Sequence, residues 1–261
     1  ALRENVFDRV TGCEISESLV DQVRSNGGLF TLNIAQEDGI ESIELGPIEI
    51  LNPNSETDRE LIRERLIHSG EAATAVPSVD VYTSGGPGSI HRLLGDASRS
   101  ERETPLVVYT AENNNRAAES LARAVRDEAG LREEVFDSRI AFVNTVIGKM
   151  SGIIVDPDEI SARGIERLAP GHDSAILVEA YNRILVSTPG GSLAKTWRPS
   201  FPTFETRDDL LPYEEAKLYG HNGVHAMGAY LADLLGKTRM DELSTVPAAV
   251  DFLHHGLVDE A

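Results

Sequence analysis

Strand-length apolar segments alternate with helix-length amphipathic segments through the first half of the chain, and this alternation constrains the fold most strongly. An apolar run at residues 104–113 is followed by a helical pattern at 115–130 and by a second apolar run at 138–150. Parallel strands need a crossover of about a dozen residues or more, and a helix usually supplies it. Repeated strand–helix units therefore predict an α/β fold, with helices on both faces of a largely parallel sheet.

The other elements are expected from periodicity and from helix caps. Ser16 is a candidate N-cap for one helix, and Ser55 or Thr57 for another. Three short segments with β-branched residues indicate a small antiparallel insertion. The expected helices are 16–28, 55–70, 87–97, 115–130, 212–236 and 240–260; the expected strands are 7–15, 29–35, 40–46, 48–52, 76–86, 104–113, 138–150, 152–156, 166–170 and 174–187, with a loop at 187–206. The loop ends near residue 205 and helices follow it, which predicts an α/β domain at 1–205 and the start of a helical domain at 206–261.

Composition narrows the classes of partner. The chain of 261 residues has 43 acidic and 24 basic side chains, for a formal net charge of −19. A surface with this much negative charge repels phosphate backbones and anionic lipids. We therefore expect neither nucleic acid nor a membrane as partner. The one cysteine, Cys13, allows no internal disulfide and favours a cytoplasmic location. No histidines or cysteines have a metal-site spacing, so no metal is expected.

Polar and small residues follow three of the expected strands. Glu14, the segment Ser84–Gly85–Gly86 and Asn113 stand at these positions. In open α/β sheets ligands bind at the carboxyl ends of strands, and an acid there hydrogen-bonds the ribose of a dinucleotide. The alternative is a solvated acid and an ordinary glycine turn. A strand followed by the usual G-x-G-x-x-G turn is absent from the sequence.

The stretch "KLYGHNGVH" places Lys217, Asn222 and His225 on one expected helix. At 100° per residue they lie at about 0°, 140° and 80° around an α-helix, within less than half of its circumference. A lysine of lowered pKa can remove a hydroxyl proton, an asparagine can donate to a developing oxyanion, and a histidine can orient a hydroxyl. The alternative is a solvated polar face. We interpret His221, with His254 and His255, as a surface or packing histidine.

These residues together resemble the polyol-specific long-chain dehydrogenases. "KLYGHNGVHAMGAYLADLLG" is similar to their K-x4-N-x2-H signature and its A-Y-L-x-x-L-x-G continuation. "VYTSGGPGSIHRLL", "VVYTAENNN", "AFVNTVIGKM" and "LVEAYNRILV" resemble further segments of the family, in the same order along the chain. The resemblance implies a Rossmann-like, doubly wound sheet at 1–205, followed by the start of an all-helical substrate domain.

The resemblance also implies an activity and a set of site residues. The family transfers a hydride between NAD and a secondary alcohol of a polyol or polyol phosphate, without a metal. The implied catalytic residues are Lys217 as general base, Asn144 and Asn222 as oxyanion donors, and His225 as a substrate ligand. The implied cofactor contacts are Glu14, Ser84, Gly85, Gly86 and Asn113. A hexuronate oxidoreductase and an inactive nucleotide-binding relative are the alternatives.

The chain departs from the family pattern at identifiable positions. Gly148 and Lys149 replace an Asp–Arg pair, and Ile184 replaces a tryptophan. The match also begins after the family's first strand and glycine-rich turn, and stops early in its helical domain. We therefore expect the sequence to be a fragment of a family member or a shortened one.

Overall fold

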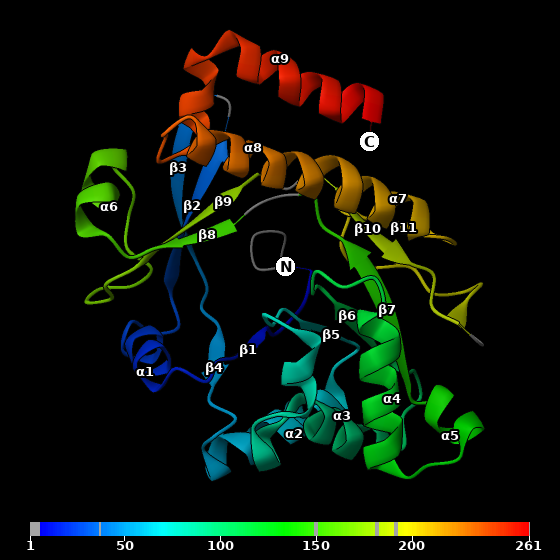
Figure 1. The fold of residues 1–261 in the computed structure, drawn as a ribbon. Helices are drawn as coiled ribbons and strands as arrows, with labels where there is room; N and C mark the ends of the chain where they lie inside the picture. The colour runs from blue at the N-terminus through cyan, green and yellow to red at the C-terminus, as the bar shows by residue number, and fades with distance from the viewer. Residues whose placement is uncertain (1–5, 37, 149–150, 181–182, 191–192, 261) are drawn as a thin grey trace. The chain divides into compact units, whose positions relative to one another are not determined.

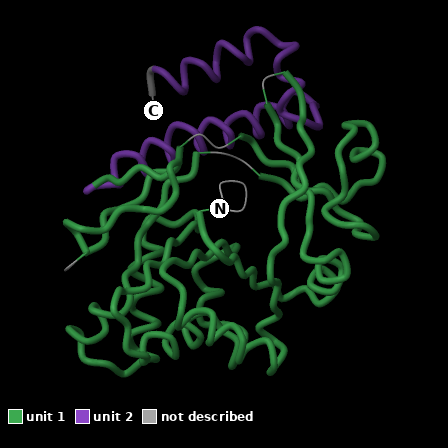
Figure 2. The backbone as a smooth tube through the Cα atoms, turned by 180° about the vertical axis from the view of Figure 1, so that it is seen from behind, with its two compact units in different colours: residues 1–207 green, residues 208–261 purple. Residues whose placement is uncertain are grey.

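The structure is a computed structural model that describes residues 6–36, 38–148, 151–180, 183–190 and 193–260. Lys149 lies outside the described residues. The chain separates into two compact units, Ala1–Arg207 and Asp208–Ala261 (Figure 2). The division falls two residues beyond the boundary expected from the sequence. Each unit is described by itself below.

The first unit is built on a five-stranded sheet with strand order β11-β10-β7-β6-β5 (Figure 1). The pairs β5–β6 and β6–β7 are parallel, β10 runs antiparallel to β7, and β11 is parallel to β10. The strands of this sheet are β5 (Glu71–Thr74), β6 (Leu106–Thr110), β7 (Ile140–Val146), β10 (Ile184–Ser187) and β11 (Phe204–Arg207). The parallel β5-β6-β7 core is the part that the strand–helix alternation predicts.

Strand β6 is buried on both faces, which its continuous apolar sequence predicts. Leu106 and Val108 face a core that contains Leu121 and Val125 of helix α4 (Ala117–Ala129). On the other face, the alternate residues of β6 pack with partly buried side chains from the segment between β10 and β11. The sheet is thus covered on one face by helices and on the other by an irregular segment.

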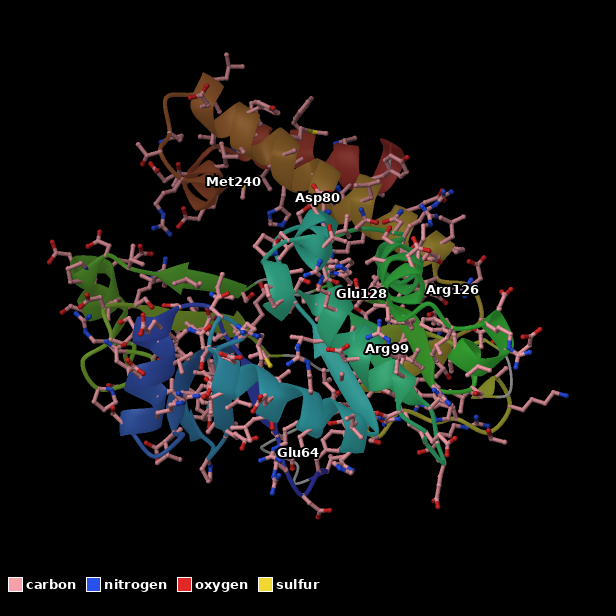
Figure 3. All side chains as sticks on the ribbon, turned by 90° about the horizontal axis from the view of Figure 1, so that it is seen from below. Glu64, Asp80, Arg99, Arg126, Glu128 and Met240 are labelled. Carbon is pink, nitrogen blue, oxygen red and sulfur yellow. The ribbon has the colours of Figure 1, made fainter. Side chains whose placement is uncertain are left out.

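Helices α3 (Ile90–Arg99) and α4 pack closely because Gly95 has no side chain. A Cβ atom at Gly95 would lie 2.9 Å from Cγ of Glu128. The Arg99 guanidinium reaches across to α4, donates to the carbonyl of Glu128 and lies 3.8 Å from its carboxylate; Figure 3 labels both residues. This pair therefore ties the ends of the two helices together.

Two smaller sheets complete the first unit. Strands β1 (Thr11–Cys13) and β4 (Glu49–Leu51) pair in parallel, and a four-stranded sheet has the order β3-β2-β9-β8. The expected antiparallel hairpin is confirmed as β2–β3. The expected caps are confirmed, since the side chains of Ser16 and Ser55 accept from Leu19 N and Asp58 N. The remaining elements of this unit are α1 (Glu17–Ser25), β2 (Phe30–Gln36), β3 (Gly39–Leu45), α2 (Glu56–His68), the 3₁₀ turns η2 (Val79–Thr83) and η3 (Gly86–Gly88), α5 (Glu133–Asp137), β8 (Ser151–Ile154), α6 (Pro157–Arg163) and β9 (Ala175–Glu179).

Several sequence-based expectations are wrong. The segment 76–86, which was expected to be a strand, contains the 3₁₀ turn η2. The strand that precedes this turn is β5, further upstream. The segment 48–52 pairs with β1 and does not extend the antiparallel insertion. The segment 166–170 is irregular, and the loop expected at 187–206 ends in β11.

The second unit is helical. Helix α7 (Leu211–Glu215) continues through a π-helical segment, η5 (Ala216–Asn222), into α8 (Gly223–Leu234). The 3₁₀ segment η6 (Met240–Thr245), helix α9 (Pro247–His255) and the π-helical segment η7 (Gly256–Glu260) follow. The small core consists of Ala232, Leu243 and Ala249. Among the described residues, none of the helices has the length and hydropathy that crossing a bilayer requires.

Candidate functional site

The three residues of the helical signature lie on a continuous helix whose geometry changes at the signature itself. Lys217 and Asn222 stand in the π-helical segment η5, and His225 lies in the first turn of α8. The N–H of Gly223 donates to the carbonyl of Leu218, five residues earlier, which is the hydrogen bond that defines a π-helix. The π-helical turn therefore falls between Lys217 and Asn222.

This turn narrows the angle over which the three side chains spread. A π-helix has wider turns than an α-helix, about 80° per residue, so five residues bring Asn222 to about 40° from Lys217. Three further α-helical steps place His225 at about 20° on the other side of Lys217. The arc falls from the expected 140° to roughly 60°. In this idealised geometry the three residues therefore fall along one side of the helix.

Lys217 meets a requirement of a general base. Its side chain is partly buried, and desolvation by burial lowers the pKa of its ammonium group. Burial disfavours the charged form, so the neutral amine that accepts a proton is more populated than in a solvated lysine. Asn222 and His225 are also partly buried.

His221, which the sequence indicates to be a surface or packing histidine, packs against a residue of the signature. Its ring centroid lies 4.5 Å from that of His225, and the two ring planes are inclined at 40°. His221 therefore belongs to the immediate surroundings of the candidate site.

In the first unit, Glu14 follows β1 directly. Its backbone N–H donates to the carbonyl of Leu51 at 3.0 Å, which continues the β1–β4 pairing. One carboxylate oxygen accepts from the N–H of Ser16, the N-cap of α1, at 2.8 Å. The carboxylate is thus held between a strand and the start of the next helix, the location expected for a ribose-binding acid.

The segment Ser84–Gly86 follows η2 and is exposed. Gly85 and Gly86 have φ values of +91° and +61°, which side chains rarely adopt, and no atom lies within 4 Å of a Cβ built on either. The open space allows a ligand to approach this backbone. Gly88, which the sequence reasoning did not single out, fixes the segment: a Cβ there would lie 2.2 Å from the carbonyl oxygen of Pro53.

A buried carboxylate, also missing from the predicted site, ties this segment to the sheet. Glu112 follows β6 and is 6% exposed. It accepts hydrogen bonds from the Thr74 hydroxyl at 3.1 Å, from the Val76 N–H at 3.0 Å and from the Tyr82 hydroxyl. Tyr82 stands two residues before Ser84, so Glu112 holds η2 and the glycine segment against the ends of β5 and β6. The glutamate in "VVYTAENNN" is the sequence feature from which this role of Glu112 could have been predicted.

Of the two predicted asparagines of this unit, one follows β6 and the other lies on the neighbouring strand β7. Asn113 is exposed after β6. Asn144 stands on β7, beside Thr110 of β6. Its amide oxygen accepts from the N–H of Ala118 at 2.9 Å, and its Nδ2 donates to Glu119 at 3.0 Å. Asn144 thereby caps α4, whose own N-cap residue makes no side-chain cap bond. A side-chain amide nitrogen carries two donor hydrogens, and the structure shows a bond from Nδ2 of Asn144 to Glu119.

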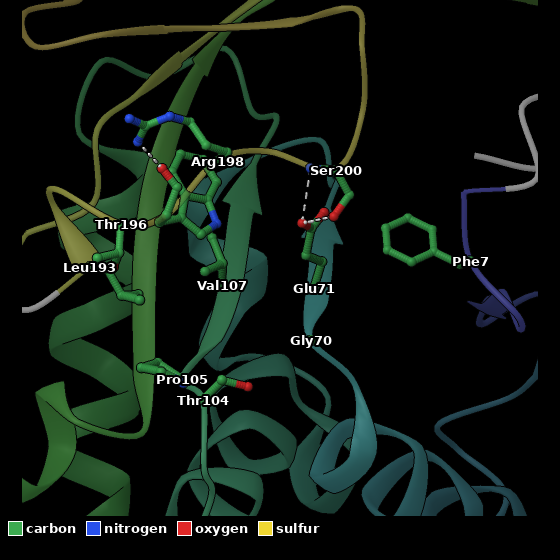
Figure 4. A pocket seen from close by; sticks show the side chains of 11 residues that line it. Phe7, Gly70, Glu71, Thr104, Pro105, Val107, Leu193, Thr196, Arg198 and Ser200 are labelled. Atoms are coloured by element: carbon green, nitrogen blue, oxygen red, sulfur yellow. Dashed lines mark hydrogen bonds between the residues drawn. The ribbon is translucent and has the colours of Figure 1, made fainter.

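A pocket of about 450 Å³ in this unit contains none of the predicted site residues (Figure 4). Residues that precede or begin β5 and β6 line one part of it, at the amino-terminal ends of these parallel strands, and Phe7 and the segment 193–200 line the rest. Glu71 contributes a carboxylate that accepts from the N–H and hydroxyl of Ser200 at 3.2 and 2.6 Å. Glu14 and Asn113, by contrast, follow the carboxyl-terminal ends of β1 and β6. No cluster of three or more metal-ligating side chains occurs in the described parts of either unit.

No family model matches the chain. Mannitol-1-phosphate 5-dehydrogenase of Lactiplantibacillus plantarum is 23% identical over 98% of this chain and 60% of that protein. The same enzyme of Pseudarthrobacter chlorophenolicus is 22% identical over 92% of this chain and 56% of its own length. A third, from Aspergillus clavatus, is 24% identical over 74% of this chain and 47% of its own length. The chain thus spans about half to three fifths of these relatives.

Two solved structures have the same fold. Mannitol 2-dehydrogenase of Pseudomonas fluorescens, in a ternary complex with NAD and D-mannitol, has a TM-score of 0.67 at 16% identity. That match covers 97% of this chain and 57% of the other. D-Sorbitol dehydrogenase in substrate-free form has a TM-score of 0.74 at 12% identity, over 95% of this chain and 57% of the other. The likeness confirms the expected Rossmann-like α/β fold.

Proposed function

We propose that this chain, a distant relative of the polyol-specific long-chain dehydrogenases, belongs to an enzyme that transfers a hydride between NAD and a secondary alcohol of a polyol or polyol phosphate. The observation that carries the proposal is that Lys217, Asn222 and His225 lie on one continuous helix, with a π-helical turn between Lys217 and Asn222. The lowered pKa of Lys217 supports it, because a solvated polar face gives no reason for a lysine to lose charge.

Each residue of the helical group has a role in this reaction. Neutral Lys217 removes the proton of the reacting hydroxyl as the hydride leaves the carbon that bears this hydroxyl. The alcohol thus becomes a carbonyl, and the lysine becomes an ammonium ion. Asn222 donates to the oxygen, whose negative charge grows as the proton leaves. Asn144 of the first unit stays the second oxyanion donor that the family resemblance implies. His225 binds a neighbouring substrate hydroxyl and fixes which carbon reacts.

The first unit provides residues that fit NAD. The carboxylate of Glu14 accepts hydrogen bonds from the adenosine ribose hydroxyls, and the open backbone of Ser84, Gly85 and Gly86 lies along the nicotinamide side, with Asn113 beside it. When bound, NAD accepts the hydride. The conformations of Gly85 and Gly86 and the open space beside them support this assignment, since a dinucleotide has to approach the backbone closely.

An assay of a substrate panel tests the proposal. The protein expressed from its complete gene is incubated with NAD and a series of polyols, polyol phosphates and hexuronates, and NADH formation is measured. We expect turnover with at least one polyol or polyol phosphate. Turnover with hexuronates alone would establish the alternative oxidoreductase. Binding of NAD without turnover of any substrate would establish the inactive nucleotide-binding relative.

A further inference from the structure

We propose that His221 is a positioning residue for His225: its imidazole ring packs against that of His225 and holds that ring in the orientation in which it binds substrate. The part about substrate rests on the proposed function. The packing itself is independent of it, because both residues belong to the same helix.

The contact follows from the helix geometry. Side chains of an α-helix tilt toward its N-terminus, so a residue lies over the turn that precedes it. His225 therefore lies over His221, four residues earlier. The ring centroids are 4.5 Å apart with planes inclined at 40°, within the range at which aromatic rings attract one another. Both residues are partly buried.

Within the helix, His221 supplies the ring against which the ring of His225 can pack. The residues three and four positions further along are Gly228 and Ala229, which have no side chain large enough to support a ring. The torsion that turns a histidine ring is broad, so the backbone alone does not fix the ring's orientation. A packing partner on the N-terminal side is therefore what limits it.

Packing alone is a property that phenylalanine shares, which makes the proposal testable by substitution. His221→Ala removes the supporting ring, whereas His221→Phe keeps an aromatic ring without nitrogen atoms. Tyr219→Ala is the matched control, because it truncates an aromatic side chain of the same π-helical segment that is 63% exposed. His221 belongs to the same segment.

The first measurement is steady-state kinetics with the best polyol substrate. An aromatic pair contributes about 0.5–1.5 kcal/mol, so we expect His221→Ala to raise KM by roughly 2- to 12-fold and to change kcat by less than about twofold. His221→Phe should restore KM, and Tyr219→Ala should leave it unchanged. If the Phe variant is as defective as the Ala variant, or if the Ala variant has a normal KM, the proposal is refuted.

The second measurement does not require activity. NMR spectra of protein with isotope-labelled histidines report the ring protons of His225, which lie in the ring current of residue 221. We expect His221→Ala to change the chemical shifts of these protons strongly. In His221→Phe an aromatic ring still lies beside them, so their chemical shifts should stay close to those of the wild type. If they do not move in His221→Ala, the contact is absent and the proposal fails. If they move but no polyol is oxidised, the proposed function fails while the positioning of His225 stands.

Discussion

The hydrogen bond from Tyr82 to Glu112 should be one of the largest single contributions to the stability of the first unit. Tyr82 is 1% exposed and Glu112 is 6% exposed, so water does not replace the bond when it is removed. A hydrogen bond to a charged group contributes about 1.5–3 kcal/mol. We expect Tyr82→Phe to lower the free energy of unfolding by that amount, which corresponds to a decrease in Tm of roughly 3–12 °C for a unit of this size.

Tyr109→Phe is a matched control in the same unit. Tyr109 is 3% exposed, and its hydroxyl makes no hydrogen bond of good geometry within the described part of the chain. Burial, followed by the charge of Glu71 and a weak hydrogen bond to it, raises the pKa of Tyr109. Removing an unpaired buried hydroxyl costs little, so this variant should be neutral or slightly more stable. Denaturant unfolding of the two variants beside the wild type measures the difference. Equal effects of Tyr82→Phe and Tyr109→Phe would refute the role assigned to Glu112.

The pH dependence of stability gives a second test of the same contact. Burial, followed by the hydrogen bond to Glu112 and the charge of Glu112, raises the pKa of Tyr82 above that of a free tyrosine. A raised pKa in the folded state means that the stabilisation is complete below the tyrosine pKa of the unfolded chain and is lost as the pH rises above it. Tyr82→Phe should therefore flatten the loss of stability between neutral and strongly alkaline pH. An unchanged pH dependence would contradict the cause assigned here.

Three further predictions concern the site. Because burial lowers the pKa of Lys217, kcat/KM should rise with pH and level off below the ordinary lysine pKa; a pH–rate profile that levels off at or above that value would contradict a buried base. Gly88→Ala should raise KM for NAD, since the new Cβ would lie 2.2 Å from the carbonyl oxygen of Pro53. Gly152→Ala is the control and should leave KM unchanged, because no atom lies within 4 Å of its Cβ position. Equal effects of the two variants would show that the close approach of Gly88 to Pro53 is unimportant. Glu14 should make kcat/KM higher with NAD than with NADP, because a carboxylate repels a 2′-phosphate, and Glu14→Ala should narrow the ratio; a preference for NADP in the wild type would refute the assignment.

The elements that local sequence determines were predictable. The buried strand β6 is a continuous apolar run, and the caps Ser16 and Ser55 are short-range hydrogen bonds that sequence position alone specifies. The order of strands and helices in the β5-β6-β7 core follows from their alternation. The relatives confirm the family resemblance, which depended on motif order along the chain.

The errors arose where side chains form bonds that compete with the local pattern. The segment 79–83 has the composition of a strand, but the Ser78 hydroxyl accepts from the N–H of Asp80 and starts a 3₁₀ turn. The segment 166–170 was expected to be a strand, yet the buried side-chain amide of Asn33 bonds to the carbonyl and N–H of Glu166, and the segment is irregular. Asn33 and Glu166 are far apart in sequence, and the bond between Ser78 and Asp80 belongs to no periodic pattern, so neither contact could be predicted from hydrophobic periodicity.

The arrangement of the candidate site residues was predicted only in part. Spacing placed Lys217, Asn222 and His225 on one helix, but the π-helical turn that narrows their arc depends on backbone hydrogen bonds that the sequence does not display. The role of Glu112 was missed for a similar reason, because its three donors come from residues 30 to 38 positions earlier. The predicted catalytic and cofactor roles stay predictions.

The central claim, that Lys217 is the base in NAD-dependent oxidation of a polyol, is tested most directly by single-turnover oxidation in the Lys217→Ala variant. Removal of a general base lowers the rate by about 10² to 10⁴. We predict a loss in that range, with the folded state and the affinity for NAD unchanged. A Lys217→Ala variant that oxidises the substrate at a rate close to that of the wild type would contradict the account.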